Sequence, residues 1–580
     1  MAEKTKTKAA QGFIQGALVL GIANFIVKII GACFKIPLIN LIGDAGSGYF
    51  NVAYQIYTFM FIVATAGFPV AISKMVSESI AKNNEYDANR VFKVAVRFLA
   101  AVGIIGTLIL LVFSDSLANL MKMPDASLGI ALIAPAVFFV ALTSAYRGYF
   151  QGRQNMYPTA ASEVIESGGK MFIGLAFAWI FMKMTVDGSM GKPVDFAASK
   201  VLTQHIQTVL ASGGAIFGVT AGTFLSCLLM TCIYVIHRRR HKLEKAVDLR
   251  QRSDKAILKS LVMIAIPITI GASVSSLTTL IDMATITRRL VVNPDVFEKY
   301  AAMFGEGTSF FSKAAEEGWQ GAQLLSQKAA TLYGMYTGKA LTMFNLPLTL
   351  VVALGTSVVP AISVAVAKSD KANAKKITES TLRIAMLFAA PCAFGMGVLS
   401  KEILYLLFGD YNAHSVLSVL SAAIIPVAVV QVSNSILQSY GRVYKPVIHM
   451  IIGGIVKVCV NFFCIPYLGI DGAPVGTGVC YLIIAVLNVL SIIRAAGIDF
   501  KWGSFVVKPI LAAAIMGAAA YLLSSFVPVG RVGCIAEIAV CGVIYLAAVV
   551  AVKAVRKEDI EMMPKGDRLA ALLARYGLLK

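Results

Sequence analysis

The sequence is poor in charged side chains, and acidic ones are especially few. Asp, Glu, Lys and Arg make up 14% of its 580 residues, and only 31 of these residues are Asp or Glu. Soluble domains carry about 25% charged residues. Hydrophobic side chains account for 58% of the chain. A mainly aqueous environment is therefore excluded, and we expect lipid to be the solvent for most of this protein.

Motifs for catalysis, metal binding and disulfide scaffolds are also missing. The sequence contains no GxSxG, HExxH or Walker A pattern, and its five His are scattered over loops and the ends of apolar runs. All nine Cys fall inside apolar runs, and none forms a CxxC pair. We therefore expect no cofactor and no metal, and a transporter rather than an enzyme.

Basic residues outnumber acidic ones, which gives a formal net charge of +21. In a soluble chain this excess would favour nucleic acid binding. Here the Lys and Arg lie in the short segments between apolar runs, and no RNP-type, zinc-finger or helix-turn-helix pattern accompanies them. We expect no nucleic acid partner.

Apolar runs long enough to cross ~30 Å of hydrocarbon recur about fourteen times and predict an all-α, polytopic membrane protein. The polar start Met1–Lys8 resembles a signal n-region, but the following run continues without a small-residue cleavage site, so we expect a retained first helix. The predicted spans are 12–41, 48–73, 91–113, 128–150, 159–183, 212–236, 258–287, 330–364, 378–400, 414–438, 446–466, 473–493, 505–526 and 532–553.

Charge alternates between successive connections. About two thirds of the 52 basic residues lie in one alternate set of connections, as the positive-inside rule requires. We therefore expect both termini to be cytoplasmic, in a bacterial plasma membrane, with tiny outward connections at Gly43–Ala45 and Leu468–Asp471. The tail 556–580 reads either as an amphipathic helix at the inner surface, in contact with membrane lipids, or as a solvated helical end.

Two parts of the chain resemble each other. Phe150–Pro158 resembles Leu437–Pro446, and at the same separation Lys170 falls on Lys457. Pro69–Lys74 likewise resembles Pro360–Ser363. Spans 1–6 and 7–12 are thus predicted to be two copies of one unit, a six-helix N-lobe and a six-helix C-lobe. The predicted divisions are 1–245 for the N-lobe, 246–500 for the C-lobe, 501–555 for two additional spans and 556–580 for the tail.

Polar side chains recur at helical spacing inside four predicted spans. A charge at mid-membrane costs at least ~2.5 kcal/mol, so such residues should face a partner or an aqueous cavity. We expect these stripes to converge on one hydrated, positively charged cavity that binds an anion; snorkelling or structural ion pairs are the alternatives for the lysines. The candidate substrate-binding residues are Asn24, Lys28 and Lys35 in the first span, Asn51, Tyr54 and Gln55 in the second, Tyr336 and Lys339 in the eighth, and Gln431 and Asn434 in the tenth.

A second group of charged residues has a spacing typical of gating or ion pairing. Glu163, Glu166 and Lys170 fall at i, i+3 and i+7, where Glu166 and Lys170 are spaced for a helical ion pair; proton or cation coupling is the alternative. Asp282 could counter Lys35, Lys339 or Arg288 in one conformation and release in another, or form a static pair. Lys457 repeats the position of Lys170 in the second copy.

Several motifs, in this order and spacing, resemble those of the multidrug/oligosaccharidyl-lipid/polysaccharide (MOP) exporter superfamily, and specifically MurJ-type lipid II flippases and the stage V sporulation protein B group. The resemblance covers essentially the whole chain. The motifs are Lys28–Gly31 with Lys35–Leu38, Tyr54–Tyr57, Pro69–Lys74, Arg147–Gly152 and Val352–Ser357.

The resemblance implies an outward flip of undecaprenyl-diphosphate-linked cell-wall precursor (lipid II) by alternating access, with the last two spans forming a groove for the lipid tail. Lys28 and Lys339 match positions of the family's cavity arginines, whereas Phe34 and Phe61 stand where better-studied members carry arginine. The alternatives are a flippase for another polyprenyl-linked saccharide (capsule, teichoic or spore polymer), a multidrug antiporter, or a scaffold for cell-wall synthesis enzymes, which are also candidate partners.

Overall fold

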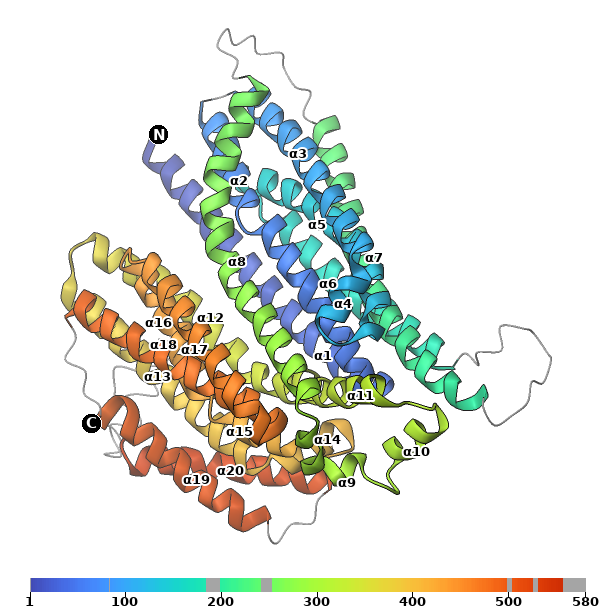
Figure 1. Cartoon of the computed structure of the whole chain (residues 1–580). Helices are drawn as coiled ribbons and strands as arrows, with labels where there is room; N and C mark the ends of the chain where they lie inside the picture. Colours follow the sequence, from blue (N-terminus) through green and yellow to red (C-terminus); the bar gives the residue numbers. More distant parts are fainter. Residues whose placement is uncertain are drawn as a thin grey trace. The chain divides into compact units, whose positions relative to one another are not determined.

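The computed structural model describes residues 2–82, 84–183, 199–240, 253–497, 503–524 and 530–555, which belong to two compact units, Met1–Gly334 and Met335–Lys580 (Figure 1). Within these ranges the chain is helical and has no strand. The all-α prediction is confirmed. The predicted cytoplasmic tail, 556–580, lies outside the described residues.

The first unit is drawn in blue to green in Figure 1. Its helices are α1 (Ala2–Thr65), α2 (Phe68–Ala81), α3 (Glu85–Val112), α4 (Ser114–Leu120), the 3₁₀ turn η1 (Pro124–Ala126), α5 (Ser127–Gly152), α6 (Tyr157–Lys183), α7 (Ser199–Arg240), α8 (Asp254–Val292), the 3₁₀ helix η2 (Pro294–Tyr300), α9 (Ala301–Phe304), α10 (Ser309–Glu316) and α11 (Gly321–Gly334).

The second unit begins with a π-helical turn, η3 (Met335–Ala340), and ends in the red helices of Figure 1. The elements that follow η3 are α12 (Leu341–Ala367), α13 (Lys371–Val398), α14 (Ser400–Phe408), α15 (His414–Ser421), α16 (Ile424–Ser439), α17 (Tyr444–Leu468), the 3₁₀ turn η4 (Gly469–Asp471), α18 (Gly472–Ala496), the π turn η5 (Gly503–Val507), α19 (Lys508–Ser524) and α20 (Arg531–Ala551).

Each predicted span coincides with one or more of these helices. Among the described residues, ten helical stretches are long and apolar enough to cross a membrane, or eleven if the bent pair α15 and α16 is one span. Two of these stretches, Val19–Ala81 and Tyr444–Ala496, each cover two predicted spans. A multi-pass membrane protein is thus confirmed, while the count of fourteen crossings stays a prediction.

Glycines stand at the two short connections that the sequence predicts. Gly43 interrupts α1 with φ 70° and ψ −175°. Gly469, between α17 and α18, has φ 67°. Positive φ is strained for residues with a Cβ but accessible to glycine, so these positions let two apolar helices follow one another with almost no loop.

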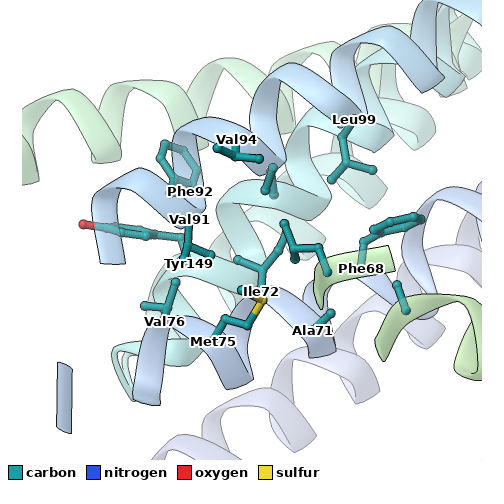
Figure 2. Close-up of a cluster of buried hydrophobic side chains, with 14 of the residues drawn as sticks. Phe68, Ala71, Ile72, Met75, Val76, Val91, Phe92, Val94, Leu99 and Tyr149 are labelled. Carbon is teal, nitrogen blue, oxygen red and sulfur yellow. The ribbon is translucent and has the colours of Figure 1, made fainter. Parts of the chain in front are cut away.

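The interior of the first unit includes a cluster of apolar side chains from α2, α3 and α5. Figure 2 shows Ile72, Met75 and Val76 of α2 together with Phe92 of α3 and Tyr149 of α5. All five side chains are buried, with at most 3% of their surface exposed. Because lipid tails are as apolar as this cluster, its stability comes from close packing more than from exclusion of water.

Glycines bring α6 and α7 into backbone contact. A Cβ added at Gly218 of α7 would lie 2.3 Å from the Cα of Gly174 in α6 and 3.0 Å from the carbonyl oxygen of Lys170. Small residues permit this close approach in membranes. Between α17 and α18 the close approach is to a side chain instead, since a Cβ at Gly476 would lie 2.0 Å from the Oδ1 of Asn461.

The α6–α7 contact supports a first prediction. Gly218→Ala is expected to destabilise the protein by about 2 kcal/mol, because the added methyl group overlaps backbone atoms that cannot move aside. Gly168→Ala, in α6, is the matched control, since no atom lies within 4 Å of its Cβ position. Thermal unfolding in detergent is the measurement; an equal midpoint for the two variants would contradict the packing described here.

Polar contacts join segments that are distant in the sequence at each of the two ends of the first unit. The predicted topology places the segments of each contact on the same side of the membrane. At one end, Arg90 of α3 pairs with Asp254 of α8 at 2.7 Å. At the other end, Gln327 of α11 donates to Asp125 at 2.6 Å, and His205 of α7 lies 3.5 Å from the same carboxylate. Segments predicted to share one side of the membrane therefore do meet within this unit. Which end faces the cytoplasm stays a prediction from charge.

The division between the two compact units follows Gly334. The helix of the predicted seventh span, α8, packs against α1, α2 and α3 of the first unit. The lobe boundaries drawn from the repeat, 1–245 and 246–500, stay a prediction. In the second unit the helices after the repeat, α19 and α20, pack against each other and against α13.

Candidate functional site

One site in the first unit contains two lysines that come from different helices. Lys35 is on α1 and Lys170 is on α6, and their charges are close enough to repel. The Nζ of Lys170 lies 4.0 Å from the ring centre of Tyr54 and 5.2 Å from that of Phe34. We call Lys35, Lys170, Tyr54 and Phe34 the paired-lysine site. Its two charges repel in the absence of a ligand, so an anion that contacts both is favoured.

Aromatic rings continue from this site along α1. Phe34 contacts Phe50, which stacks on Tyr54 at 5.8 Å with an interplanar angle of 14°. Tyr57 and Phe61 follow at centroid distances of 6.0 and 5.9 Å. We call the rings of Phe34, Phe50, Tyr54, Tyr57 and Phe61 the aromatic ladder. Ring faces suit both an ammonium group and the apolar faces of sugars, while tyrosine hydroxyls can bond to sugar hydroxyls.

An arginine network adjoins the aromatic ladder. Arg147 of α5 pairs with Glu166 of α6 at 2.8 Å and donates to Ser162 at 3.0 Å. The spacing in the sequence suggested Lys170 as the partner of Glu166; in the structure Glu166 pairs with Arg147. Glu163 is half-buried, and its Oε2 is buried with no hydrogen-bond partner among the described residues.

The other predicted residues of the first unit lie in different surroundings. Asn24 and Lys28 are exposed on α1, and Gln55 is half-buried. Asn51 is buried, and its amide donates to the carbonyl oxygen of Ser47 at 2.8 Å, which satisfies it within the helix. For these residues a role in binding substrate stays a prediction.

Between α1 and α6 lies an open apolar hollow of about 540 Å³. Its lining residues are Pro37, Leu41, Leu175, Ala176 and Trp179. Pro37 and Leu41 follow Lys35 on α1. An apolar chain attached to an anionic head group could therefore lie along the same pair of helices that carries the two lysines.

In the second unit the predicted residue Lys339 is held by an aspartate. It lies in the π turn η3, is 3% exposed, and donates to both carboxylate oxygens of Asp410 at 2.7 and 3.0 Å. The aspartate is placed by its own loop, because α14 ends in the left-handed Gly409 and the amide of Asn412 donates to Asp410 at 3.2 Å. π turns often mark functional positions in helices.

The remaining predicted residues of the second unit form two polar groups. Tyr336, also in η3, lies with its hydroxyl 3.4 Å from that of Thr477 in α18. Asn434 accepts a hydrogen bond from the buried Asn488 at 2.8 Å, and Asn488 lies 2.6 Å from His449. Gln431 is half-buried, and its Oε1 has no hydrogen-bond partner among the described residues.

The predicted gating residues fall in both units. Asp282 on α8 is 6% exposed, Arg288 on the same helix is exposed, and Lys457 on α17 is half-buried. A switch in the partners of Asp282 stays a prediction.

Sequence reasoning missed several polar residues that the structure places at these sites. Arg147 and Asp410 pair with predicted residues, and His449 and Asn488 extend the Asn434 network. At the end of the first unit that carries Asp125, burial raises the pKa of the Glu317 carboxyl, although the charge of His205 acts in the opposite direction. The buried His and Asn in apolar runs were available as signals; Asp410, in a loop, was not.

Comparisons with known proteins agree with this architecture. A family model described as lipid II flippase MurJ matches residues 324–540, and one described as polysaccharide biosynthesis protein matches residues 13–189. The chain is 24% identical to the uncharacterized membrane protein YabM of Bacillus subtilis (strain 168), over 97% of this chain and 96% of that protein.

Stage V sporulation protein B of Bacillus subtilis (strain 168) is 21% identical, over 97% of this chain and 99% of that protein. Among solved structures, a lipid II flippase MurJ in an inward closed conformation superposes with a TM-score of 0.63 at 13% identity, covering 92% of this chain and 98% of that one. The similarity to this solved structure shows that the chain has the same fold.

Proposed function

Because the chain is a MurJ/SpoVB-like exporter of the MOP superfamily, and hence a transporter and not an enzyme, we propose that it flips undecaprenyl-diphosphate-linked cell-wall precursor, lipid II. The direction is from the cytoplasmic to the outer leaflet, by alternating access, with both termini in the cytoplasm. The alternative substrate is another polyprenyl-linked saccharide.

The observation that carries the proposal is the paired-lysine site. A polyprenyl diphosphate is compact and multiply charged, so it can contact Lys35 and Lys170 together and relieve their repulsion. The tyrosines of the ladder offer rings and hydroxyls to the sugars that follow the diphosphate. The apolar hollow beside Lys35 is of a kind that accepts an isoprenoid chain.

The site also accounts for one of two departures from the family pattern, the one at Phe34. Phe34 and Phe61 occupy positions at which the resemblance leads one to expect arginine. In this chain Lys170 brings a positive charge from α6 to the ring of Phe34. The cation is thus supplied by a neighbouring helix. A multidrug antiporter for cationic drugs is disfavoured, because two adjacent lysines would repel its substrate.

Transport in proteoliposomes tests the proposal. We expect lipid II to reach the outer leaflet of vesicles containing the protein faster than in protein-free vesicles. An inside-negative potential should accelerate the outward movement of the anion, because each charge gains about 2.3 kcal/mol per 100 mV. A polyprenyl-linked capsule or teichoic precursor provides the comparison.

The outcomes separate the candidate functions. Flipping of the second lipid but not of lipid II would move the assignment to another polyprenyl-linked saccharide. If neither lipid crosses with the potential applied, the flippase proposal fails and a scaffold for cell-wall synthesis enzymes is favoured.

A further inference from the structure

One face of α20, in the second unit, carries an acid where an apolar residue is expected. Cys534, Glu537 and Cys541 fall at i, i+3 and i+7 and are 2%, 3% and 4% exposed. Cys541 belongs to an apolar cluster with Leu399 and Met516. Glu537 is therefore enclosed by thiols and hydrocarbon, surroundings that strongly disfavour an isolated negative charge.

A second acid faces it. Glu402 lies on α14, which packs against α20, and the two carboxyl groups are close enough for their charges to repel. Glu402 Oε2 and Glu537 Oε1 are both buried, and neither has a hydrogen-bond partner among the described residues. Buried carboxylate oxygens normally accept hydrogen bonds, so each of these atoms lacks a hydrogen-bond donor that a ligand could supply.

A single proton shared by the two carboxyl groups would satisfy both atoms. When one carboxylate takes up a proton, it becomes a neutral acid whose O–H can donate to the other, so the pair then carries one negative charge in place of two. Mg²⁺ or Ca²⁺ would need about six oxygen ligands, and among the described residues no group of three or more His, Cys, Asp or Glu side chains is arranged to hold a metal ion. The other titratable groups of this face of α20 are Cys534 and Cys541. The hydroxyl of Tyr545, further along α20, already donates to the carbonyl oxygen of Leu387 at 2.5 Å.

We propose that Glu402 and Glu537 form a proton-binding site between α14 and α20, in which the two carboxyl groups share one proton. Glu537 lies in the last predicted span, outside the twelve-helix repeat, whereas Glu402 lies in the predicted C-lobe, in the connection between the ninth and tenth spans. By the predicted topology both residues lie towards the outer side of the membrane. It does not depend on which saccharide the protein carries. Lipid II flipping can therefore be disproved while the proton-binding site is confirmed, and the proton-binding site can be disproved while lipid II flipping is confirmed.

The test uses dicyclohexylcarbodiimide, which adds to protonated carboxyl groups in apolar surroundings, on the full-length protein in liposomes. At neutral pH we expect the pair to be modified at least about tenfold faster than the exposed Glu306, as read from the modified peptides by mass spectrometry. The rate should fall as the pH is raised. Glu402→Gln should slow modification of Glu537, because an amide opposite the carboxylate removes the repulsion that favours the proton; Glu306→Gln is the matched control.

A second measurement covers variants that fail to fold. The infrared spectrum of the wild-type protein should contain the carbonyl stretch of a protonated carboxylic acid at neutral pH, and this band should disappear on alkalisation. Modification of both acids no faster than Glu306, or protection by Na⁺ with no dependence on pH, would overturn the proposal.

Discussion

Replacing Lys170 with Met is expected to lower flipping of a polyprenyl-diphosphate-linked saccharide in proteoliposomes by about tenfold to a hundredfold. The loss corresponds to about 1.5–3 kcal/mol, the usual contribution of a hydrogen bond to a charged group. Lys170 lies over Tyr54, and its charge is close enough to that of Lys35 to repel it, so its removal leaves one cation to hold the diphosphate. Lys170→Arg keeps the charge and should retain most of the rate.

A matched control for this prediction lies on the same helix. Lys183, at the end of α6, also lies over an aromatic ring, with its Nζ 4.2 Å from the centre of Trp179, but it is exposed. Lys183→Met should leave flipping unchanged. The assignment of the paired-lysine site fails if Lys170→Met transports at the wild-type rate with equal protein in the vesicles.

The second large effect concerns Lys339 and Asp410. Asp410→Asn is expected to destabilise the protein by about 2 kcal/mol, because it leaves the ammonium group of a buried lysine without its counter-charge. This is less than the 3–5 kcal/mol of a fully buried pair, since the side chain of Asp410 is 38% exposed. Thermal unfolding in detergent measures the change.

Exchanging the two charges separates structure from transport. The double variant Lys339→Asp with Asp410→Lys restores an ion pair and should recover much of the stability lost in each single variant. If Lys339 binds the anionic head group, the exchanged protein should still fail to flip it. Recovery of both stability and transport would show that the pair is structural, and would remove Lys339 from the substrate site.

Helix positions could be predicted from the sequence because they depend on local properties. A continuous apolar run of about 20 residues satisfies its own backbone hydrogen bonds in lipid only as a helix, and Gly43 marks a break that needs no distant contact. The i, i+4 spacing of Glu166 and Lys170 is local too, yet it did not decide their partners. Arg147, 19 positions before Glu166, donates to it with one N–H of its planar guanidinium at 2.8 Å.

The partners that sequence reasoning missed come from tertiary structure. Asp410 lies in a loop between α14 and α15, and nothing near it in the sequence points to Lys339, 71 positions earlier. Glu402 and Glu537 are separated by more than a hundred residues, and each alone reads as an acid near the end of a span. Only the packing of α14 against α20 brings them together.

The π turn at Met335–Ala340 has a geometric consequence for the lysine within it. Such a turn holds one residue more than an α-helical turn. If the wide turn migrated along the helix, each residue it passed would rotate by about 100° and advance by about 1.5 Å. A slip of one residue would thus swing the ammonium group of Lys339 out of reach of Asp410 while the helix ends stayed in place. A one-residue shift of the π turn would therefore decide whether the charge of Lys339 is paired with Asp410 or released from it.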